Sequence, residues 1–311
     1  MSVRIQIEVP ATSANLGPGY DAFGLALGIF DTLTLTIHDD PVDPSTCVRV
    51  TGESAETLPT DRSHLIMRVI GDVLNAEYPE APAGLGERLS LDCVNRIPHS
   101  RGLGSSAAAI VGAIALAGEV GAHAGGQKLS RQRVLELASE LEGHPDNAAP
   151  AVSGGLTISL PDPARSWQVP ANTIAEVTVL VPDVRLDTEI ARSVIPASIE
   201  HEVAAENSAR AGLLIHGFVT DSSVLLEATA DRLHQEFRRD AYPESMSLVD
   251  ALRAEGLPAV ISGAGPTVLV LASTVPPALI SEAVTLVHTS IDLGGYRLKE
   301  TKQTSDSRER R

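Results

Sequence analysis

Several kinds of residue are scarce in this chain of 311 residues, and each scarcity argues against a class of protein. The two cysteines, Cys47 and Cys93, are too few for a disulfide framework and lack the spacing of metal ligands, which favours a reduced, cytoplasmic chain. Lysine and arginine number 24 against 40 acidic residues, a net charge of −16, which disfavours broad binding to nucleic acid or to an anionic membrane. A phosphate-bearing ligand must therefore be held by a local feature.

Long apolar runs are missing as well. The longest, Ala107–Ala117, is interrupted by Gly112 and is shorter than the roughly 20 residues that a membrane-spanning helix needs. Apolar residues occupy every second position of Val3–Val9, which is the period of a half-buried strand and not the continuous apolar core of an export signal. We therefore expect neither a transmembrane segment nor an export signal.

What the chain does contain is enough apolar material for a large core, because 43% of its residues are hydrophobic and only 21% are charged. Its length favours two lobes, since single cores stop growing near roughly 250–300 residues. The strands and helices do not alternate as regular βαβ units, so the fold class is α+β. Hydrophobic periodicity predicts strands at 31–38, 88–94, 156–160, 176–181, 259–262 and 267–271, and helices at 105–118, 130–143, 206–217, 224–233 and 278–287.

The segment Pro161–Pro170 holds three prolines and several polar residues, and we interpret it as the linker between the lobes. The predicted division is an N-terminal ATP-binding domain over 1–165, a C-terminal domain over 166–300, and a polar, frayed tail over 301–311. Of the predicted helices, 105–118 is apolar nearly all round and should be buried.

A glycine-rich loop leads into that apolar helix. Residues Pro98–Ala109 have the sequence PHSRGLGSSAAA, which places backbone N–H groups and a helix N-terminus at one point. Such an arrangement suits a phosphate chain, because the helix dipole carries roughly half a positive charge there. Ser105 and Ser106 add hydroxyls for phosphate oxygens or a magnesium ion. The alternative interpretation is a plain tight turn before a buried helix.

Two better-known phosphate loops are disfavoured. No Gly-Lys-Ser/Thr triplet occurs in the chain, which excludes a Walker A loop. The spacing Gly102-x-Gly104-x-x-Ala107 matches a dinucleotide-binding pattern, but the loop Gly121–Gly126 after the helix has no carboxylate where that pattern needs one.

Three segments together give the chain a family resemblance. They are Pro10–Asp21 (PATSANLGPGYD), the glycine-rich loop, and Ile261–Thr267 (ISGAGPT), and in this order they resemble the homoserine kinases of the GHMP kinase superfamily. The resemblance implies a two-lobe α+β fold, with a ribosomal-protein-S5-like N-terminal lobe, a ferredoxin-like C-terminal lobe and the active site between them. The first segment carries no basic residue, which is typical of homoserine kinases and not of the mevalonate or galactose branches.

The resemblance also assigns the nucleotide and metal residues. It implies ATP and Mg²⁺, with Ser106 and Glu142 as the metal ligands and with Gly263 and Gly265 supporting the phosphate loop. Magnesium prefers oxygen ligands and takes few from the protein, which agrees with this pair. The implied ATP-binding residues are Pro98, His99, Ser100, Arg101, Gly102, Leu103, Gly104, Ser105, Ser106, Ala107 and Ala108.

For the acceptor, the resemblance implies Asn15, Asp21 and His144 at one end of the substrate and Arg192 and Arg238 on its carboxylate, with Arg239 as the alternative to its neighbour. A planar guanidinium suits a carboxylate because it can form two parallel hydrogen bonds. The stretch Glu142–Asn147 is compact here, whereas some homoserine kinases carry an insertion that would place His144 differently.

Asn147 and Asp146 are the candidate catalytic residues. We favour Asn147 as the group that orients the acceptor hydroxyl, with Asp146 supporting it. A general base at Asp146 remains the alternative, since a loose transition state makes a strong base optional.

The implied reaction is the ATP-dependent phosphorylation of L-homoserine to O-phospho-L-homoserine in threonine biosynthesis. The alternatives are a GHMP-family kinase for a different small alcohol and a non-catalytic ligand-binding relative. The intact Ser106, Glu142 and Asn147 argue against the last. The expected partners are L-homoserine and ATP, with no nucleic acid and no membrane, and the family suggests a homodimer.

Overall fold

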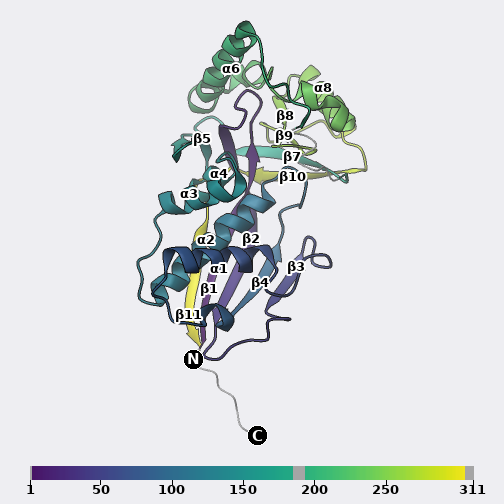
Figure 1. Cartoon of the computed structure of the whole chain (residues 1–311). Coiled ribbons are helices and arrows are strands. Elements are labelled where there is room, and N and C mark those ends of the chain that lie inside the picture. The colour runs from purple at the N-terminus through teal and green to yellow at the C-terminus, as the bar shows by residue number, and fades with distance from the viewer. Residues whose placement is uncertain (1, 185–192, 305–311) are drawn as a thin grey trace.

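The strands of the chain form two sheets, which the computed structural model describes over residues 2–184 and 193–304 (Figure 1). The first sheet has seven strands. The order β11-β1-β2-β4-β3 runs across it, and β5 and β6 extend from β2. Their bounds are β1 Ser2–Ala14, β2 Phe23–Ile37, β3 Val48–Gly52, β4 Leu89–Asn95, β5 Leu156–Pro161, β6 Ala164–Val169 and β11 Arg297–Thr304.

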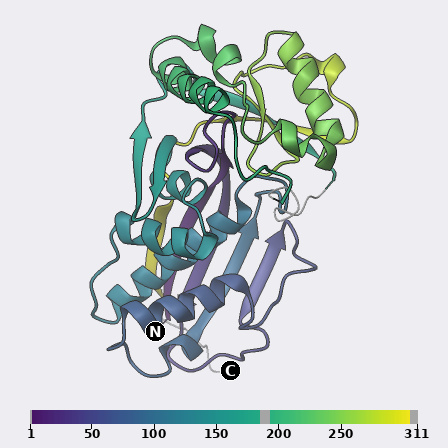
Figure 2. The ribbon, with the colours of Figure 1, turned by 45° about the horizontal axis from the view of Figure 1, so that its top comes forward.

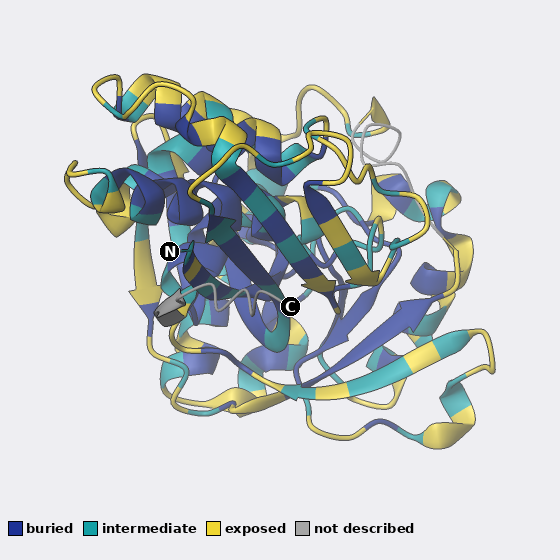
Figure 3. Ribbon diagram, turned by 90° about the horizontal axis from the view of Figure 1, so that it is seen from below, coloured by how far each residue is buried: buried dark blue, intermediate teal, exposed yellow. Residues whose placement is uncertain are grey.

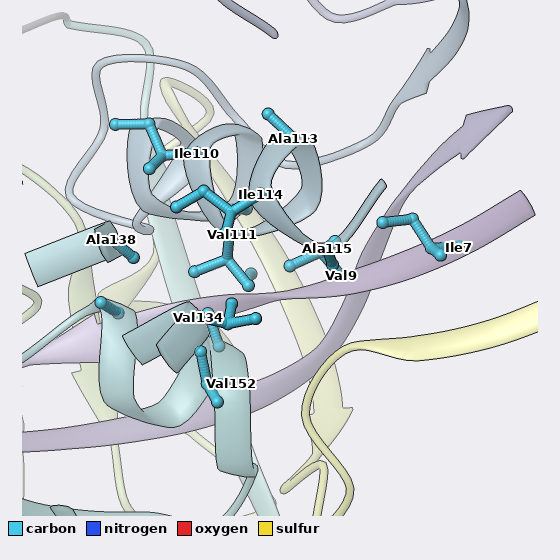
Figure 4. Packing of buried hydrophobic residues seen from close by; sticks show 14 of the residues in the cluster. Ile7, Val9, Ile110, Val111, Ala113, Ile114, Ala115, Val134, Ala138 and Val152 are labelled. Carbon is cyan, nitrogen blue, oxygen red and sulfur yellow. The ribbon is translucent and has the colours of Figure 1, made fainter. Parts of the chain in front are cut away.

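The alternation in β1 sets which face of this sheet is covered. Ile5, Ile7 and Val9 are buried, and the residues between them are partly exposed. The buried side chains meet α2 (Ser105–His123), and α3 (Arg131–Glu142) and α4 (Ala148–Ser153) pack beside it (Figure 4). The remaining helix of this lobe, α1 (Leu65–Glu77), lies against α2.

Helix α2 is the central element of the core, as its composition predicts. Gly112 allows its close contact with the sheet, because a Cβ there would lie 2.5 Å from a methyl carbon of Leu33. By length and composition this helix is the one described segment that could cross a membrane, but 72% of its most apolar window is buried inside the structure. Figure 3 shows the buried residues gathered along the inner strands and helices. Helix α2 is therefore a core helix here.

The second sheet has the order β10-β7-β9-β8, and all its pairs are antiparallel. When these four strands are numbered by their order along the chain, they lie in the order 4-1-3-2, which is the ferredoxin-like order. The bounds are β7 Glu176–Pro182, β8 Ala259–Ile261, β9 Val268–Val270 and β10 Val284–Ser290. Among the described residues it is accompanied by the helices α6 His201–Val219, α7 Leu225–Ala228 and α8 Pro243–Ala254, and by the 3-10 turns Ser222–Val224, Glu236–Ala241 and Pro277–Leu279. A further 3-10 turn, Leu85–Arg88, precedes β4 in the first lobe.

The two lobes share a core. From β7, Val179 and Val181 enter the cluster that fills the N-terminal lobe, whereas Leu180 enters a second cluster with Met246 and Leu252 of α8. The turn between β1 and β2 rises among the C-terminal helices, and Figure 2 shows the C-terminal lobe above the N-terminal one. This turn holds most of the first motif.

Four predictions about elements were wrong. Residues 278–287 form no helix, because the β-branched residues of β10 (VTLVHTS) pair with β7. The helix expected at 224–233 ends after α7. The proposed linker contains β6, which forms a hairpin with β5, and the proposed tail begins within β11, which pairs with β1. The domain boundary near 165 stays a prediction, but strand pairing does not follow it.

Candidate active site

The three motifs lie side by side between the lobes and are joined by backbone hydrogen bonds. The Thr12 N–H donates to Leu103 O at 3.0 Å, which joins the first motif to the glycine-rich loop. The Gly263 N–H donates to Ala14 O at 3.1 Å, and the Thr267 N–H donates to Arg101 O at 3.3 Å. Segments more than 80 residues apart in sequence therefore form one site.

The glycine-rich loop approaches the third motif too closely for a side chain. Gly102 has a φ of 76°, and a Cβ there would lie 2.3 Å from Ser262 O. Ser262 Oγ lies 2.6 Å from Gly102 O and 2.8 Å from Ser13 Oγ, so this serine touches both other motifs. Gly265 lies against Gly102 as well. The two glycine motifs thus support each other.

A cavity of about 530 Å³ opens beside this junction. Helix α2 begins at its wall after Gly104, which provides no side-chain cap for the first turn of the helix. Backbone N–H groups of a helix N-terminus and its dipole favour an anion. The lining residues are Asn15, Leu65, Ser100, Gly102, Gly104, Ser105, Ser106, Ala107, Ile110, Leu141, Glu142, His144, Asp146, Asn147, Arg238, Gly263 and Ala264. Of the loop residues predicted to bind ATP, five are not among the described residues that line it, namely Pro98, His99, Arg101, Leu103 and Ala108.

Ser106 and Glu142 are in direct contact at the cavity wall. The Ser106 hydroxyl donates to Glu142 Oε1 at 2.6 Å. Glu142 is the last residue of α3, which begins with a Ser130 cap and ends at a left-handed Gly143, as the sequence predicts. Burial raises the pKa of the Glu142 carboxyl, and the hydrogen bond from Ser106 only partly offsets this. A cation placed here would therefore favour the ionised carboxylate.

The segment after Gly143 forms a small hydrogen-bonded network. Asp146 is nearly fully buried, and its Oδ1 lies 2.6 Å from His144 Nδ1 and accepts from the Asn147 N–H at 2.9 Å. On its other side, Asn147 Oδ1 accepts from the Thr12 hydroxyl at 2.8 Å. Asn147 is thus held between Asp146 and the first motif, at the cavity wall.

The predicted acceptor-binding residues divide into three groups. Asn15 lines the cavity, and its side chain donates to Gly263 O at 2.9 Å and accepts from the Asp21 N–H at 3.0 Å. Asp21 itself is not among the described lining residues. Arg238 lines the cavity and is only 2% exposed, whereas Arg239 pairs with Glu236 and Asp250 at the surface. Arg192 lies outside the described residues.

A second hollow of about 360 Å³ adjoins the first. Both hollows are lined by Leu65, Ser100, Ser105 and Ser106, so they meet at the glycine-rich loop. The other residues of the second hollow are Asp31, Leu33, Leu58, Pro59, Ser63, His64, Ile66, Arg68, Asn95, His99, Ala108 and Ala109.

His64 is the unusual residue of the second hollow. It is 4% exposed, and its Nδ1 accepts from the Ile66 N–H, which places the proton on Nε2. Burial lowers the pKa of the ring, which favours the neutral form. Nε2 has no hydrogen-bond partner among the described residues. A buried donor without a partner costs stability, so this N–H is a candidate contact for a ligand.

Sequence reasoning missed three residues that the structure places at or beside the site, namely Thr12, which bonds Asn147, His64, which lines the second hollow, and His234, which contacts Arg238. Thr12 stands inside the first motif and could have been found there. His64 and His234 stand outside the three motifs, and only the fold places them beside the site.

Comparisons with known proteins agree with this geometry. A family model described as the GHMP kinases N terminal domain matches residues 64–155, and one described as GHMP kinases C terminal matches residues 216–287. A homoserine kinase of Streptomyces avermitilis is 47% identical over 87% of this chain and 86% of its own length. A homoserine kinase of Cutibacterium acnes is 42% identical over 94% of this chain and 97% of its own.

Solved structures share the fold. The structure of homoserine kinase from Cytophaga hutchinsonii matches with a TM-score of 0.77 and 23% identity, over 95% of this chain and 97% of that one. The structure of mevalonate kinase from L. major matches with a TM-score of 0.62 and 13% identity, over 91% and 94%.

Proposed function

The chain belongs to the GHMP kinase family, and from that premise we propose that it transfers the γ-phosphoryl group of ATP to L-homoserine, giving O-phospho-L-homoserine for threonine biosynthesis. The observation that carries the choice of acceptor is the position of Arg238. Its buried guanidinium lines the same cavity as the phosphate loop, so an acceptor with a carboxylate can lie within reach of a bound phosphate chain. A simple alcohol has no carboxylate with which to contact this guanidinium.

The two adjoining hollows accommodate the two parts of ATP. The triphosphate lies along the glycine-rich loop at the start of α2, where backbone N–H groups and the helix dipole stabilise negative charge. The purine lies in the second hollow between Leu33, Leu58 and Ile66. The shared residues Ser105 and Ser106 stand where the base and the phosphates join.

The residues beside the phosphate position fit a magnesium ion. Ser106 and Glu142 supply hydroxyl and carboxylate oxygens, which are the donors that magnesium prefers. Burial raises the pKa of the partly buried Glu142 carboxyl, and a bound cation would favour its charged form. When bound, the ion would neutralise charge on the β- and γ-phosphate oxygens.

Asn147 orients the acceptor hydroxyl. Thr12 fixes its Oδ1 and Asp146 holds its backbone, so the side-chain amide has a defined direction at the cavity wall. The hydroxyl oxygen attacks the γ-phosphorus as the bond from that phosphorus to the ADP oxygen breaks, and the hydroxyl proton passes to the transferred phosphoryl group or to solvent. A loose transition state puts little demand on a base. Asp146 supports this arrangement by holding both His144 and Asn147.

The remaining inferences concern the setting of the enzyme. Cys47 and Cys93 are buried free thiols, and burial raises the pKa of Cys93 to about 12, which supports a reduced, cytoplasmic chain. A homodimer and the absence of nucleic-acid and membrane partners stay predictions drawn from the sequence.

An acceptor panel tests the function. With ATP and magnesium, we expect the purified protein to release ADP faster with L-homoserine than with serine, threonine, mevalonate or galactose. Serine is one methylene shorter, so it cannot place its hydroxyl and its carboxylate at both ends of the site at once. ADP release that is no faster with homoserine than with another member of the panel would reject the assignment and favour a kinase for a different alcohol.

The position of the purine has its own test. We expect His64→Leu to raise the KM for ATP roughly three- to tenfold, because one neutral hydrogen bond to the base is lost. The stability should change little, because the variant loses the acceptor for the Ile66 N–H at the start of α1 as well as a buried donor without a partner. The KM for homoserine should stay the same.

A surface histidine provides the control. His38→Leu removes a ring that bonds Ser90 on the sheet and is not among the lining residues of either hollow. An ATP KM that is equal in the parent and the His64 variant would place the purine elsewhere.

A further inference from the structure

A buried histidine lies directly behind Arg238. His234 is fully buried, and its Nδ1 lies 3.1 Å from Arg238 Nη1. Its Nε2 lies 2.9 Å from Gly17 O in the first motif, and a carbonyl can only accept. Nε2 therefore carries the proton, and Nδ1 is the acceptor for the guanidinium.

The surroundings of His234 maintain this tautomer. The ring stacks on Tyr20, with centroids 5.2 Å apart. Asp231 accepts hydrogen bonds from the backbone N–H groups of Leu233, His234 and Gln235, which fixes the turn that carries the ring. Burial lowers the pKa of His234, so the neutral form is favoured, although Asp231 and Asp21 oppose this shift. A neutral ring is required, because a protonated Nδ1 could not accept from an arginine.

The contact also orients the guanidinium. Nη1 of Arg238 carries two hydrogens, which point to His234 Nδ1 and to Gly263 O at 3.3 Å. Together these two contacts fix the orientation of the guanidinium plane at the cavity wall.

We propose that His234 is a positioning residue for the phosphorylation of homoserine: through its Nδ1 it holds Arg238 in the orientation that receives the acceptor carboxylate. The proposal rests on the proposed function and extends it to a residue outside the three motifs. His234 links the turn of the first motif, at Gly17, to the arginine of the C-terminal lobe. It acts through Arg238 and does not touch the reacting atoms.

The test compares two acceptors. For His234→Leu we expect the KM for L-homoserine to rise roughly tenfold, because a hydrogen bond that orients a charged group is lost. The KM for ATP should barely change. With 3-aminopropan-1-ol, which is homoserine without its carboxylate, the variant and the parent should have equal rates. His234→Gln, whose amide can both accept and donate, should recover most of the affinity for homoserine.

A double variant separates positioning from a general structural effect. In an Arg238→Lys background, His234→Leu should add less than about twofold to the homoserine KM, because the two residues act as a unit. Additive effects, or an equal loss with both acceptors, would overturn the proposal. Should His234→Leu not fold, His234→Gln decides: its homoserine KM should stay close to that of the parent, and a large rise that is the same in the Arg238→Lys background rejects the proposal. A parent protein without homoserine-dependent ADP release would instead reject the proposed function.

Discussion

Glutamine in place of Glu142 is expected to lower turnover by at least about a hundredfold and to move the magnesium titration to higher concentration. The substitution keeps the shape of the side chain and its place opposite Ser106, but an amide oxygen carries no charge with which to hold a hard cation. The fold should persist, because burial opposes ionisation of this carboxyl in the protein without metal. Turnover against magnesium concentration, with circular dichroism as the check on folding, measures the effect.

The same helix offers the matched control. Glu140 is exposed two residues earlier on α3, so Glu140→Gln removes one negative charge from the same region without touching the cavity. Its magnesium titration should coincide with that of the parent. If Glu142→Gln folds normally and also titrates like the parent, Glu142 does not bind the metal.

The fold was predictable where one physical pattern dominates. Alternation identified β1, and an apolar composition identified α2 as a buried helix. Local capping chemistry gave both ends of α3, because Ser130 accepts the first backbone bond and Gly143 adopts the left-handed conformation.

Prediction failed where pairing with a distant strand decides the outcome. β10 pairs with β7, about a hundred residues earlier, and its β-branched residues favour a strand only because that partner is present. β11 is polar because it pairs with β1 alone, and a polar sequence after residue 299 has the composition of a tail. Prolines made β6 resemble a linker, although it pairs along its whole length with β5.

The site residues also divide into those that the sequence could identify and those that it could not. Residues within the three motifs could be identified because glycine, serine and carboxylate patterns have a chemical meaning by themselves. His64 and His234 have none, since a histidine in a sequence shows neither its tautomer nor its neighbours. Their roles follow only from the hydrogen bonds that fix the proton on Nε2.

Lysine at position 238 is expected to raise the KM for L-homoserine by roughly 10- to 150-fold, which corresponds to about 1.5–3 kcal/mol for a hydrogen bond to a charged group. Arg238→Lys keeps the charge but loses the planar fork. The effect should appear in KM, because contacts with the non-reacting end of a substrate contribute mainly uniform binding. The KM for ATP should hardly move.

The neighbouring arginine, Arg239, provides a matched control. Arg239 bonds Glu236 and Asp250 at the surface, so Arg239→Lys should leave the homoserine KM within about twofold of the parent, as surface ion pairs contribute little. With 3-aminopropan-1-ol as the acceptor, Arg238→Lys and the parent should have similar KM values, since this acceptor has no carboxylate for residue 238 to contact. A homoserine KM that does not respond to Arg238→Lys would mean that the carboxylate is bound elsewhere. Arg192, the other arginine that the resemblance assigns to this task, is then the next position to substitute.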